Sequence, residues 1–130
     1  MKDIFKTGDL KVFEKTVSNS DTAVFESGEV HSVYATFALG RDAEWSSRLF
    51  VLEMKEVDEE GIGTFLNIRH HSPALVGQTV IFEAVISNLE KNIIDCKVTA
   101  KVGERLIAEI ETGQKIIKKE RLKALFESLA

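Results

Sequence analysis

The sequence predicts an α+β fold in which one antiparallel sheet wraps around a central helix. Three observations predict it: an early helical segment rich in apolar residues, a series of alternating strands joined by short turns after it, and no other segment able to cover the whole sheet. An antiparallel sheet commonly buries one face, and an apolar helix can cover that face. We therefore expect a curved sheet packed around one long helix.

Length and composition indicate one globular domain over residues 1–130. Hydrophobic residues make up 44% of the chain and charged residues 29%, and a chain of this size buries about two thirds of its unfolded surface without a metal or a disulfide. The formal net charge of −4 argues against nucleic acid as a partner, because binding nucleic acid requires a basic surface.

Cysteine content and the N-terminus indicate the compartment. Cys96 is the single cysteine, which excludes an intramolecular disulfide and fits a reducing environment. Its apolar neighbours predict an inert core thiol. Neither a signal peptide nor a run of membrane-spanning length is present, so we expect a cytoplasmic protein without a membrane partner.

The first predicted elements are a weak strand and the central helix. Residues 10–18 alternate weakly, and residues 19–35 are mixed, with turn signals. Good helix formers without proline predict a helix over residues 36–54, and Thr36 is a suitable N-cap. The first half of this helix is apolar nearly all round, which is typical of a buried helix.

Strands and turns follow in order after the helix. We expect a loop at 58–61, a strand at 64–71, and a crossing segment at 72–77, because its proline does not fit a central strand. Alternation and turn residues predict the rest: strands at 78–89, 93–102 and 105–117, turns at 91–92 and 103–104, and an amphipathic helix at 118–129.

A histidine lies on the apolar face of the strand at 64–71. Side chains alternate between the two faces of a strand. This alternation gives one face Thr64, Leu66, Ile68 and His70, while His71 points the other way with polar neighbours. An imidazole among apolar side chains is either a satisfied core residue or a working base, and adjacent strand histidines point apart, which argues against a metal site.

The predicted helix carries a polar stripe with a notch. Thr36, Gly40 and Glu44 are spaced i, i+4 and i+8, so they share one side of the helix. Relative to alanine, Gly40 lowers the stability of the helix by about 1 kcal/mol. Its missing side chain leaves a notch between the Thr36 hydroxyl and the Glu44 carboxylate. The alternative is that Gly40 allows a strand or a second subunit to pack closely.

The spacing of these residues resembles that of the fluoroacetyl-CoA-specific thioesterase family. The likeness covers about residues 33–117 and rests on four short motifs: Ala35–Thr36, Glu44–Trp45, Gly63–Thr64, and His70 before the segment Pro73–Gly77. The resemblance implies a hotdog fold, in which the sheet wraps a central helix. It also implies an acyl-CoA thioesterase, with a small acyl-CoA as substrate.

The resemblance assigns roles to individual residues. Thr36, Glu44 and His70 would form the catalytic constellation. Gly63 would lie beside the acyl pocket, and we expect Gly40 and Thr64 to contribute to substrate binding. No metal and no cofactor are implied, apart from coenzyme A as part of the substrate.

Two further expectations follow from the same resemblance. Residues 23–35 are shorter than the family's lid segment and offer Phe25 and Tyr34 as aromatic residues, so thioester hydrolysis is implied rather than fluoroacetyl specificity. Hotdog proteins pair two sheets edge to edge, which implies a homodimer with active sites at the seam. The Gly63–His70 strand of one subunit would then face the Thr36–Glu44 helix of the other.

Thioester chemistry fits these residue types. Partial burial would lower the pKa of His70 and keep it a neutral base near pH 7. Thr36 could act as nucleophile, and amide groups at the helix start could bind the oxyanion. Direct water attack and an acyl-enzyme route both remain open. Two other functions also remain open: a non-catalytic module that binds acyl-CoA or another small ligand, and a hydratase or dehydratase. The hydratase or dehydratase needs a His/Asp pair that the sequence does not offer.

The remaining candidates have structural explanations. His31 and His71 are expected at the surface or rim, and Asp42 as a solvated or helix N-terminal charge. We expect Trp45 and Phe50 to be core or subunit-contact aromatics. Residues 118–121 read as a solvated helix start, with binding of coenzyme A phosphates as the weaker alternative.

Overall fold

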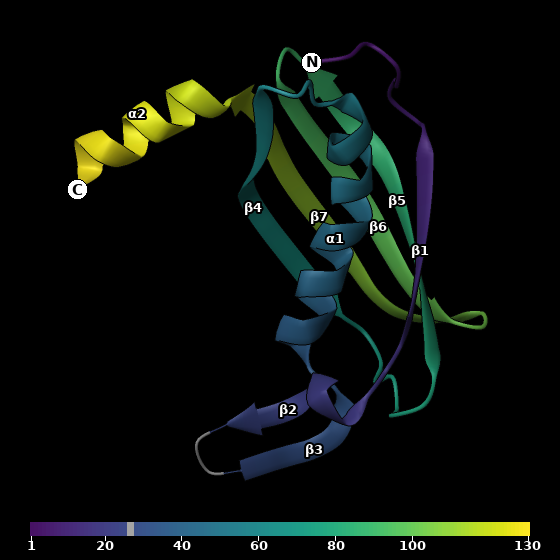
Figure 1. The fold of residues 1–130 in the computed structure, drawn as a ribbon. Coiled ribbons are helices and arrows are strands. Elements are labelled where there is room, and N and C mark those ends of the chain that lie inside the picture. Colours follow the sequence, from purple (N-terminus) through teal and green to yellow (C-terminus); the bar gives the residue numbers. More distant parts are fainter. Residues whose placement is uncertain (26–27) are drawn as a thin grey trace.

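A long helix, α1 (Thr36–Met54), lies across one face of a five-stranded antiparallel sheet (Figure 1). The computed structural model describes the main chain of residues 1–25 and 28–130 and the side chains of residues 1–23 and 32–130. The strand order is β1-β5-β6-β7-β4, so the predicted sheet around one helix is confirmed. The strands are β1 (Leu10–Thr16), β4 (Glu59–His70), β5 (Thr79–Glu90), β6 (Ile93–Val102) and β7 (Arg105–Lys118).

The core lies between α1 and the concave face of the sheet. Every second residue of β6 from Ile94 to Ala100 is buried, as the alternation predicts. Burial of one large apolar side chain contributes about 1.5–3 kcal/mol. Helix and strands both supply such side chains: Leu39, Phe50, Met54, Phe82, Ile86, Ile107 and Ile116. Cys96 belongs to this core, and burial raises the pKa of its thiol to about 12, as expected for an inert core thiol.

Helix α1 differs from the prediction at its start and along one side. Ala35 is the N-cap residue and Thr36 is the first helical residue, so the prediction of Thr36 as N-cap is wrong. The helix is also not buried all round, because the side chains of Phe37, Trp45 and Leu52 are exposed. The sheet covers one side of the helix only, and the apolar residues of the other side remain accessible.

Strand β4 begins earlier than predicted and contains an irregularity. Glu59 pairs with Lys118 on β7, so the predicted loop at 58–61 is wrong. Charged residues are common on edge strands, and they masked the strand signal. A β-bulge between Gly63 and Phe65 inserts one extra residue, Thr64, and such an insertion changes which face the next side chains occupy.

Glycines let α1 approach β4 closely along a contact that we call the α1–β4 seam (residues 36–51 against residues 61–70). A Cβ on Gly61 would meet the side chain of Val51. A Cβ on Gly63 would lie 2.5 Å from Oε1 of Glu44. Helix and strand run in opposite directions along this seam, so the start of α1 meets the end of β4.

Residues 19–34 form a separate small unit beyond the start of α1 (Figure 1). A short 3₁₀ turn, η1 (Asn19–Asp21), leads into the hairpin of β2 (Thr22–Phe25) and β3 (Gly28–Tyr34). A bridge between Val33 and Leu75 ties the hairpin to the crossing segment. This hairpin therefore covers the end of the molecule at which α1 begins.

The C-terminal helix α2 (Lys119–Leu129) projects away from the sheet (Figure 1). None of its residues is buried, and the apolar side chains of Leu125, Phe126 and Leu129 are exposed. The predicted turns after β5 and β6 are confirmed, with φ angles of 54° at Lys91 and 59° at Gly103. Among the described residues, no helix is long and apolar enough to cross a membrane.

Candidate active site

Thr36 and His70 meet at the end of the α1–β4 seam. Thr36 is the first residue of α1 and His70 is the last residue of β4. Oγ1 of Thr36 lies 3.2 Å from Nδ1 of His70, a hydrogen-bond distance in which either atom can carry the proton. The opposite directions of helix and strand place these two residues together although 34 positions separate them in the chain.

The environment of His70 favours its neutral form. Desolvation by burial lowers the pKa of His70 below its ordinary value of 6.5, and the charge of His71 acts in the same direction, while the Ser72 main chain opposes both. Nε2 of His70 is buried and has no hydrogen-bond partner in the described part of the chain. One ring nitrogen is therefore held by Thr36, and the other is left for a ligand or for a proton transfer.

A cavity of about 330 Å³ opens beside this pair. Its wall comes from the small hairpin, the start of α1 and the crossing segment. The lining residues are Ala23, Val33, Tyr34, Ala35, Thr36, His70, His71, Ser72 and Pro73. The cavity is open to solvent on one side, so a ligand can reach the Thr36–His70 pair from outside.

Glu44 lies elsewhere on the same seam. It is half-buried, and its carboxylate stands against Gly63. Eight residues of helix separate it from Thr36, which corresponds to about 12 Å along the axis. Within one chain, the structure brings Thr36 to His70 and Glu44 to Gly63, but it keeps the two pairs apart.

The other two expected substrate-binding residues occupy different surroundings. The space beside Gly40 is filled by the side chain of Ile68, whose Cδ1 would lie 2.6 Å from an added Cβ. The close-packing alternative for Gly40 is therefore the arrangement that the structure has. Oγ1 of Thr64 lies beside Gly113, on the face of the sheet away from α1, because the bulge removes Thr64 from the face of His70.

Sequence reasoning missed a buried ionic cluster behind the cavity. The hydroxyl of Tyr34 donates to Asp42, and Arg41 contacts both Asp42 and Asp21 at 3.0 and 2.9 Å. Asp42 is buried, so its predicted place as a solvated or helix N-terminal charge is wrong. Tyr34 is only 1% exposed, so it is a core residue rather than an accessible lid residue.

The pKa values of this cluster follow its hydrogen bonds. Burial alone would raise the pKa of Asp21, but hydrogen bonds from the Ser18 main chain and from Arg41 outweigh it and lower the pKa to about 2. Hydrogen bonds to Asp42 and Asp21 raise the pKa of the Arg41 guanidinium. The sequence signal was the spacing of Ser18 and Asp21, which is typical of a capping box, and the structure contains that box.

The other residues that the sequence analysis singled out are not part of the Thr36–His70 pair. His71 lies at the rim, with its Nε2 3.9 Å from Glu109. Phe50 is a core residue, and Trp45 is 41% exposed on α1. Lys118 is exposed and pairs with Asp58 at 2.9 Å. The predictions for His31 and for the side chain of Phe25 lie outside the described residues.

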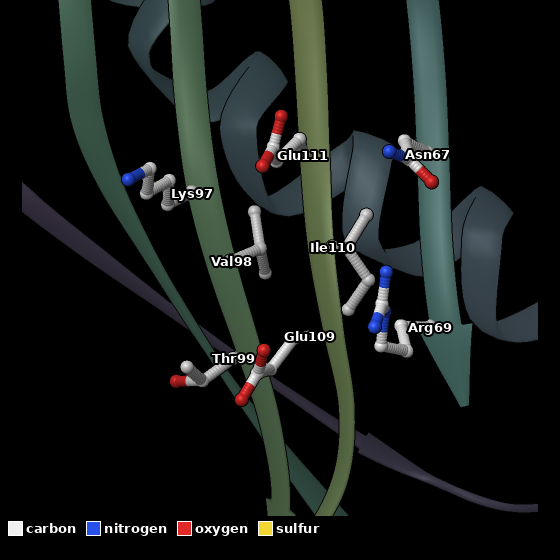
Figure 2. A pocket seen from close by; sticks show the side chains of 8 residues that line it. All are labelled: Asn67, Arg69, Lys97, Val98, Thr99, Glu109, Ile110 and Glu111. Atoms are coloured by element: carbon white, nitrogen blue, oxygen red, sulfur yellow. The ribbon is translucent and has the colours of Figure 1, made fainter. Parts of the chain in front are cut away.

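A second cavity, of about 320 Å³, lies on the outer face of the sheet. Figure 2 shows its polar side chains on the side of the strands away from α1, while Val98 and Ile110 belong to the core. Opposite charges face one another across neighbouring strands there, as in the register pairs Arg69–Glu109 and Lys97–Glu111, which is typical of a solvated sheet face. The lining residues are Asn67, Arg69, Lys97, Val98, Thr99, Glu109, Ile110 and Glu111.

Comparison with protein families places this arrangement among thioesterases. The profile described as "Fluoroacetyl-CoA-specific thioesterase" matches residues 17–120. This range contains Thr36, Glu44, Gly63 and His70. No curated protein sequence matches the chain significantly.

Solved structures support the same assignment. A Thermus thermophilus hypothetical protein, described as a thioesterase superfamily member, is 35% identical, with a TM-score of 0.92 over 98% of this chain and 94% of that chain. The fluoroacetyl-CoA thioesterase FlK is 20% identical (TM-score 0.89, 98% and 99% covered). A hot-dog-like protein from Thermanaerovibrio acidaminovorans is 19% identical (TM-score 0.86, 97% and 94% covered). The last two similarities establish the hotdog fold.

Proposed function

Because the chain belongs to the fluoroacetyl-CoA-specific thioesterase family and is a thioester hydrolase, we propose that its substrate is a small acyl group carried on coenzyme A. Structures of FlK are described in complex with fluoroacetate and CoA and with acetyl-CoA, which supports this ligand class. The open cavity beside His70 gives such a ligand access to the Thr36–His70 pair. A buried single cysteine fits our proposal of a cytoplasmic location.

The contact between Thr36 and His70 is the observation that carries the proposal. A neutral imidazole held through Nδ1 has a defined orientation, and its Nε2 has no hydrogen-bond partner in the described chain. Such an imidazole can accept or return a proton during thioester cleavage. The attacking oxygen is either Oγ1 of Thr36, which gives an acyl-enzyme, or a water molecule.

We propose that a second copy of the chain completes the site. In the described chain, β4 has a strand neighbour on one side only, β7. An antiparallel pair of β4 strands would place the His70 end of one copy beside the Glu59 end of the other. The Thr36–His70 pair would then approach Glu44 of the partner subunit. The strand from Gly63 to His70 packs on its own helix here, and Glu44 stands against its own Gly63. The Thr36–His70 pair of the other copy would therefore meet Glu44 across the interface.

The test is release of free thiol from a panel of acyl-CoA esters, from acetyl to octanoyl. We expect turnover of short esters, and we expect His70→Ala to lower kcat by about 10²–10⁴-fold. Lys97→Ala is the control, because Lys97 lies on the outer face of the sheet, away from this cavity; its kcat should stay within about twofold of wild type.

Each other result has a distinct meaning. Binding of acyl-CoA without thiol release would support the non-catalytic module instead. Loss of an enoyl-CoA without thiol release would support a hydratase. Unchanged turnover in His70→Ala would remove His70 from the mechanism.

A further inference from the structure

A buried polar cluster lies directly under the turn of α1 that carries Glu44. Its members are Ser47, Thr112 and Gln114, each no more than 2% exposed. Thr112 Oγ1 donates to Ser47 Oγ at 2.9 Å, and Gln114 Nε2 donates to the same oxygen at 3.0 Å. Ser47 in turn donates its hydroxyl to the carbonyl oxygen of Glu44 at 2.9 Å.

This cluster fixes which way the carboxamide of Gln114 faces. The carbonyl oxygen of Glu44 can only accept, and Ser47 uses its single O–H on that carbonyl. Gln114 must therefore present its nitrogen to both oxygens, at 3.0 and 3.5 Å. Its Oε1 faces away from them, is buried, and finds no hydrogen-bond partner among the residues that the structure describes.

The register of the sheet places Gln114 beside Glu44. Gln114 on β7 lies directly opposite Gly63 on β4, and directly opposite residues of an antiparallel pair have Cβ positions about 5 Å apart. Gly63 has no side chain, and Oε1 of Glu44 stands 2.5 Å from where its Cβ would be. A carboxamide with an unpartnered oxygen and a carboxylate therefore come from side chains that flank one glycine.

We propose that Gln114 Oε1 and the Glu44 carboxylate together hold an ordered water molecule above Gly63, and that this water attacks the acyl carbon. A buried acceptor without a partner costs about 1–3 kcal/mol, and a water that donates one hydrogen to each acceptor removes this cost. Both of its lone pairs remain free, and one of them is directed toward a substrate. The water's part in hydrolysis rests on the proposed thioesterase function, whereas the water site itself does not.

The chemical step balances without any further reactant. The water oxygen bonds to the acyl carbon while one of its protons passes to the Glu44 carboxylate. The bond from the acyl carbon to the leaving atom then breaks. This atom is the sulfur of coenzyme A on the direct route, or, on the acyl-enzyme route in the proposed dimer, Oγ1 of Thr36 from the other copy, since Thr36 of the same chain lies about 12 Å from Glu44 along the helix axis. The leaving atom takes the proton from Glu44, and the free acid departs.

The first test is a high-resolution crystal structure of the wild-type protein. We expect one water oxygen within about 2.6–3.2 Å of both Gln114 Oε1 and a Glu44 carboxylate oxygen. The water should be lost in Gln114→Met, which keeps the length of the side chain and removes the acceptor. A wild-type structure without a water bridging these two groups would overturn the proposal, whatever the enzymatic activity.

The second test is kinetic and uses a short acyl-CoA ester. Gln114→Met should lower kcat about 10–100-fold with KM within about twofold, because water orientation acts on the reaction step rather than on ligand binding. The matched control is Thr112→Val, which removes another hydrogen bond from the same cluster but no group that faces the water. Its kcat should stay within about twofold of wild type.

A double-mutant cycle separates a shared water from a merely structural role. If Gln114 and Glu44 act on one water, Gln114→Met should cause little further loss of kcat in the Glu44→Gln background. Additive losses, or equal losses in Gln114→Met and Thr112→Val, would overturn the role in hydrolysis while the thioesterase function stands. A bridging water in a wild-type protein that releases no thiol from any ester would sink the proposed function and leave the water site intact.

Discussion

His70 obtains its chemical properties from the place where its strand ends. It lies between the apolar seam, where Ile68 packs on Gly40, and the cavity beside Thr36. Burial on one side lowers the pKa of the imidazole, and Thr36 holds Nδ1 on the other. A base that is neutral at physiological pH follows from these two contacts.

The lowered pKa of His70 predicts the pH dependence of turnover. Neutral His70 is the active form, so kcat/KM should be constant at high pH and fall as pH decreases through the pKa of the free enzyme. Because burial lowers that pKa, the midpoint of the acid limb should lie below the ordinary value of 6.5. The measurement is kcat/KM for a short acyl-CoA ester across pH 4–9. A midpoint above the ordinary histidine value would contradict the assignment.

The α1–β4 seam is the element that brings the candidate residues together. Close packing depends on glycines at Gly40, Gly61 and Gly63, each of which faces a side chain of the opposite element. Since the helix and the strand run in opposite directions, each contact fixes the next along the seam. A shift of one residue in β4 would separate His70 from Thr36 and Gly63 from Glu44 at the same time.

Gly61→Ala tests this packing. The added methyl group would overlap Val51, and overpacking of this kind costs about 1–3 kcal/mol in the free energy of unfolding. Urea denaturation measures the loss. Val51→Ala removes the overlapping methyl groups, so the double variant should be less destabilised than the sum of the single variants. Strict additivity would show that the two positions do not meet.

At the scale of the whole molecule, one buried ionic cluster joins three parts of the chain. Asp21 follows β1, Tyr34 ends the small hairpin, and Arg41 and Asp42 belong to α1. These contacts hold the hairpin beside the start of α1, where Val33 and Ala35 line the cavity. The shape of the candidate site thus depends on charges that lie behind it.

Asp21 predicts a loss of stability in acid. Its folded pKa of about 2 lies below the ordinary 3.8, so its contribution is fully present above pH 3.8 and is lost as pH falls toward 2. The difference corresponds to about 2 kcal/mol. Urea denaturation at pH 7 and pH 3 should show about half of this loss, roughly 1 kcal/mol, because folded Asp21 is still mostly ionised at pH 3. Asp21→Asn should be less stable at pH 7 and less sensitive to acid. An equal acid sensitivity of variant and wild type would contradict the prediction.

The proposed dimer predicts a coupled loss of assembly and activity. Sedimentation equilibrium should give twice the 14.5 kDa mass of one chain. Trp45→Arg changes an exposed aromatic side chain next to Glu44 on α1 and should weaken association about tenfold or more. Turnover should fall with the fraction of dimer. A fully active monomer would show that one chain holds a complete site.

The sequence by itself determined the chemistry-bearing residues and the order of elements outside residues 19–35, where it did not predict the hairpin of β2 and β3. Regular alternation in β6 and uninterrupted helix formers in α1 gave bounds that match the structure, because both signals are local and strong. The family-like spacing singles out Thr36, Glu44 and His70. Charged residues masked the strand signal at the start of β4, and the β-bulge put Thr64 on the face opposite to the predicted one.

Only the tertiary structure decided which of these residues meet. Sequence spacing placed Thr36 and Glu44 on one stripe, but the rise of a helix separates them by about 12 Å. Asp42 of α1 is buried with Tyr34 of β3, and Gln114 of β7 lies opposite Gly63 of β4, so both depend on how separate elements pack. Local patterns specify helices and strands, whereas the partners of a buried polar group are set by how those elements pack.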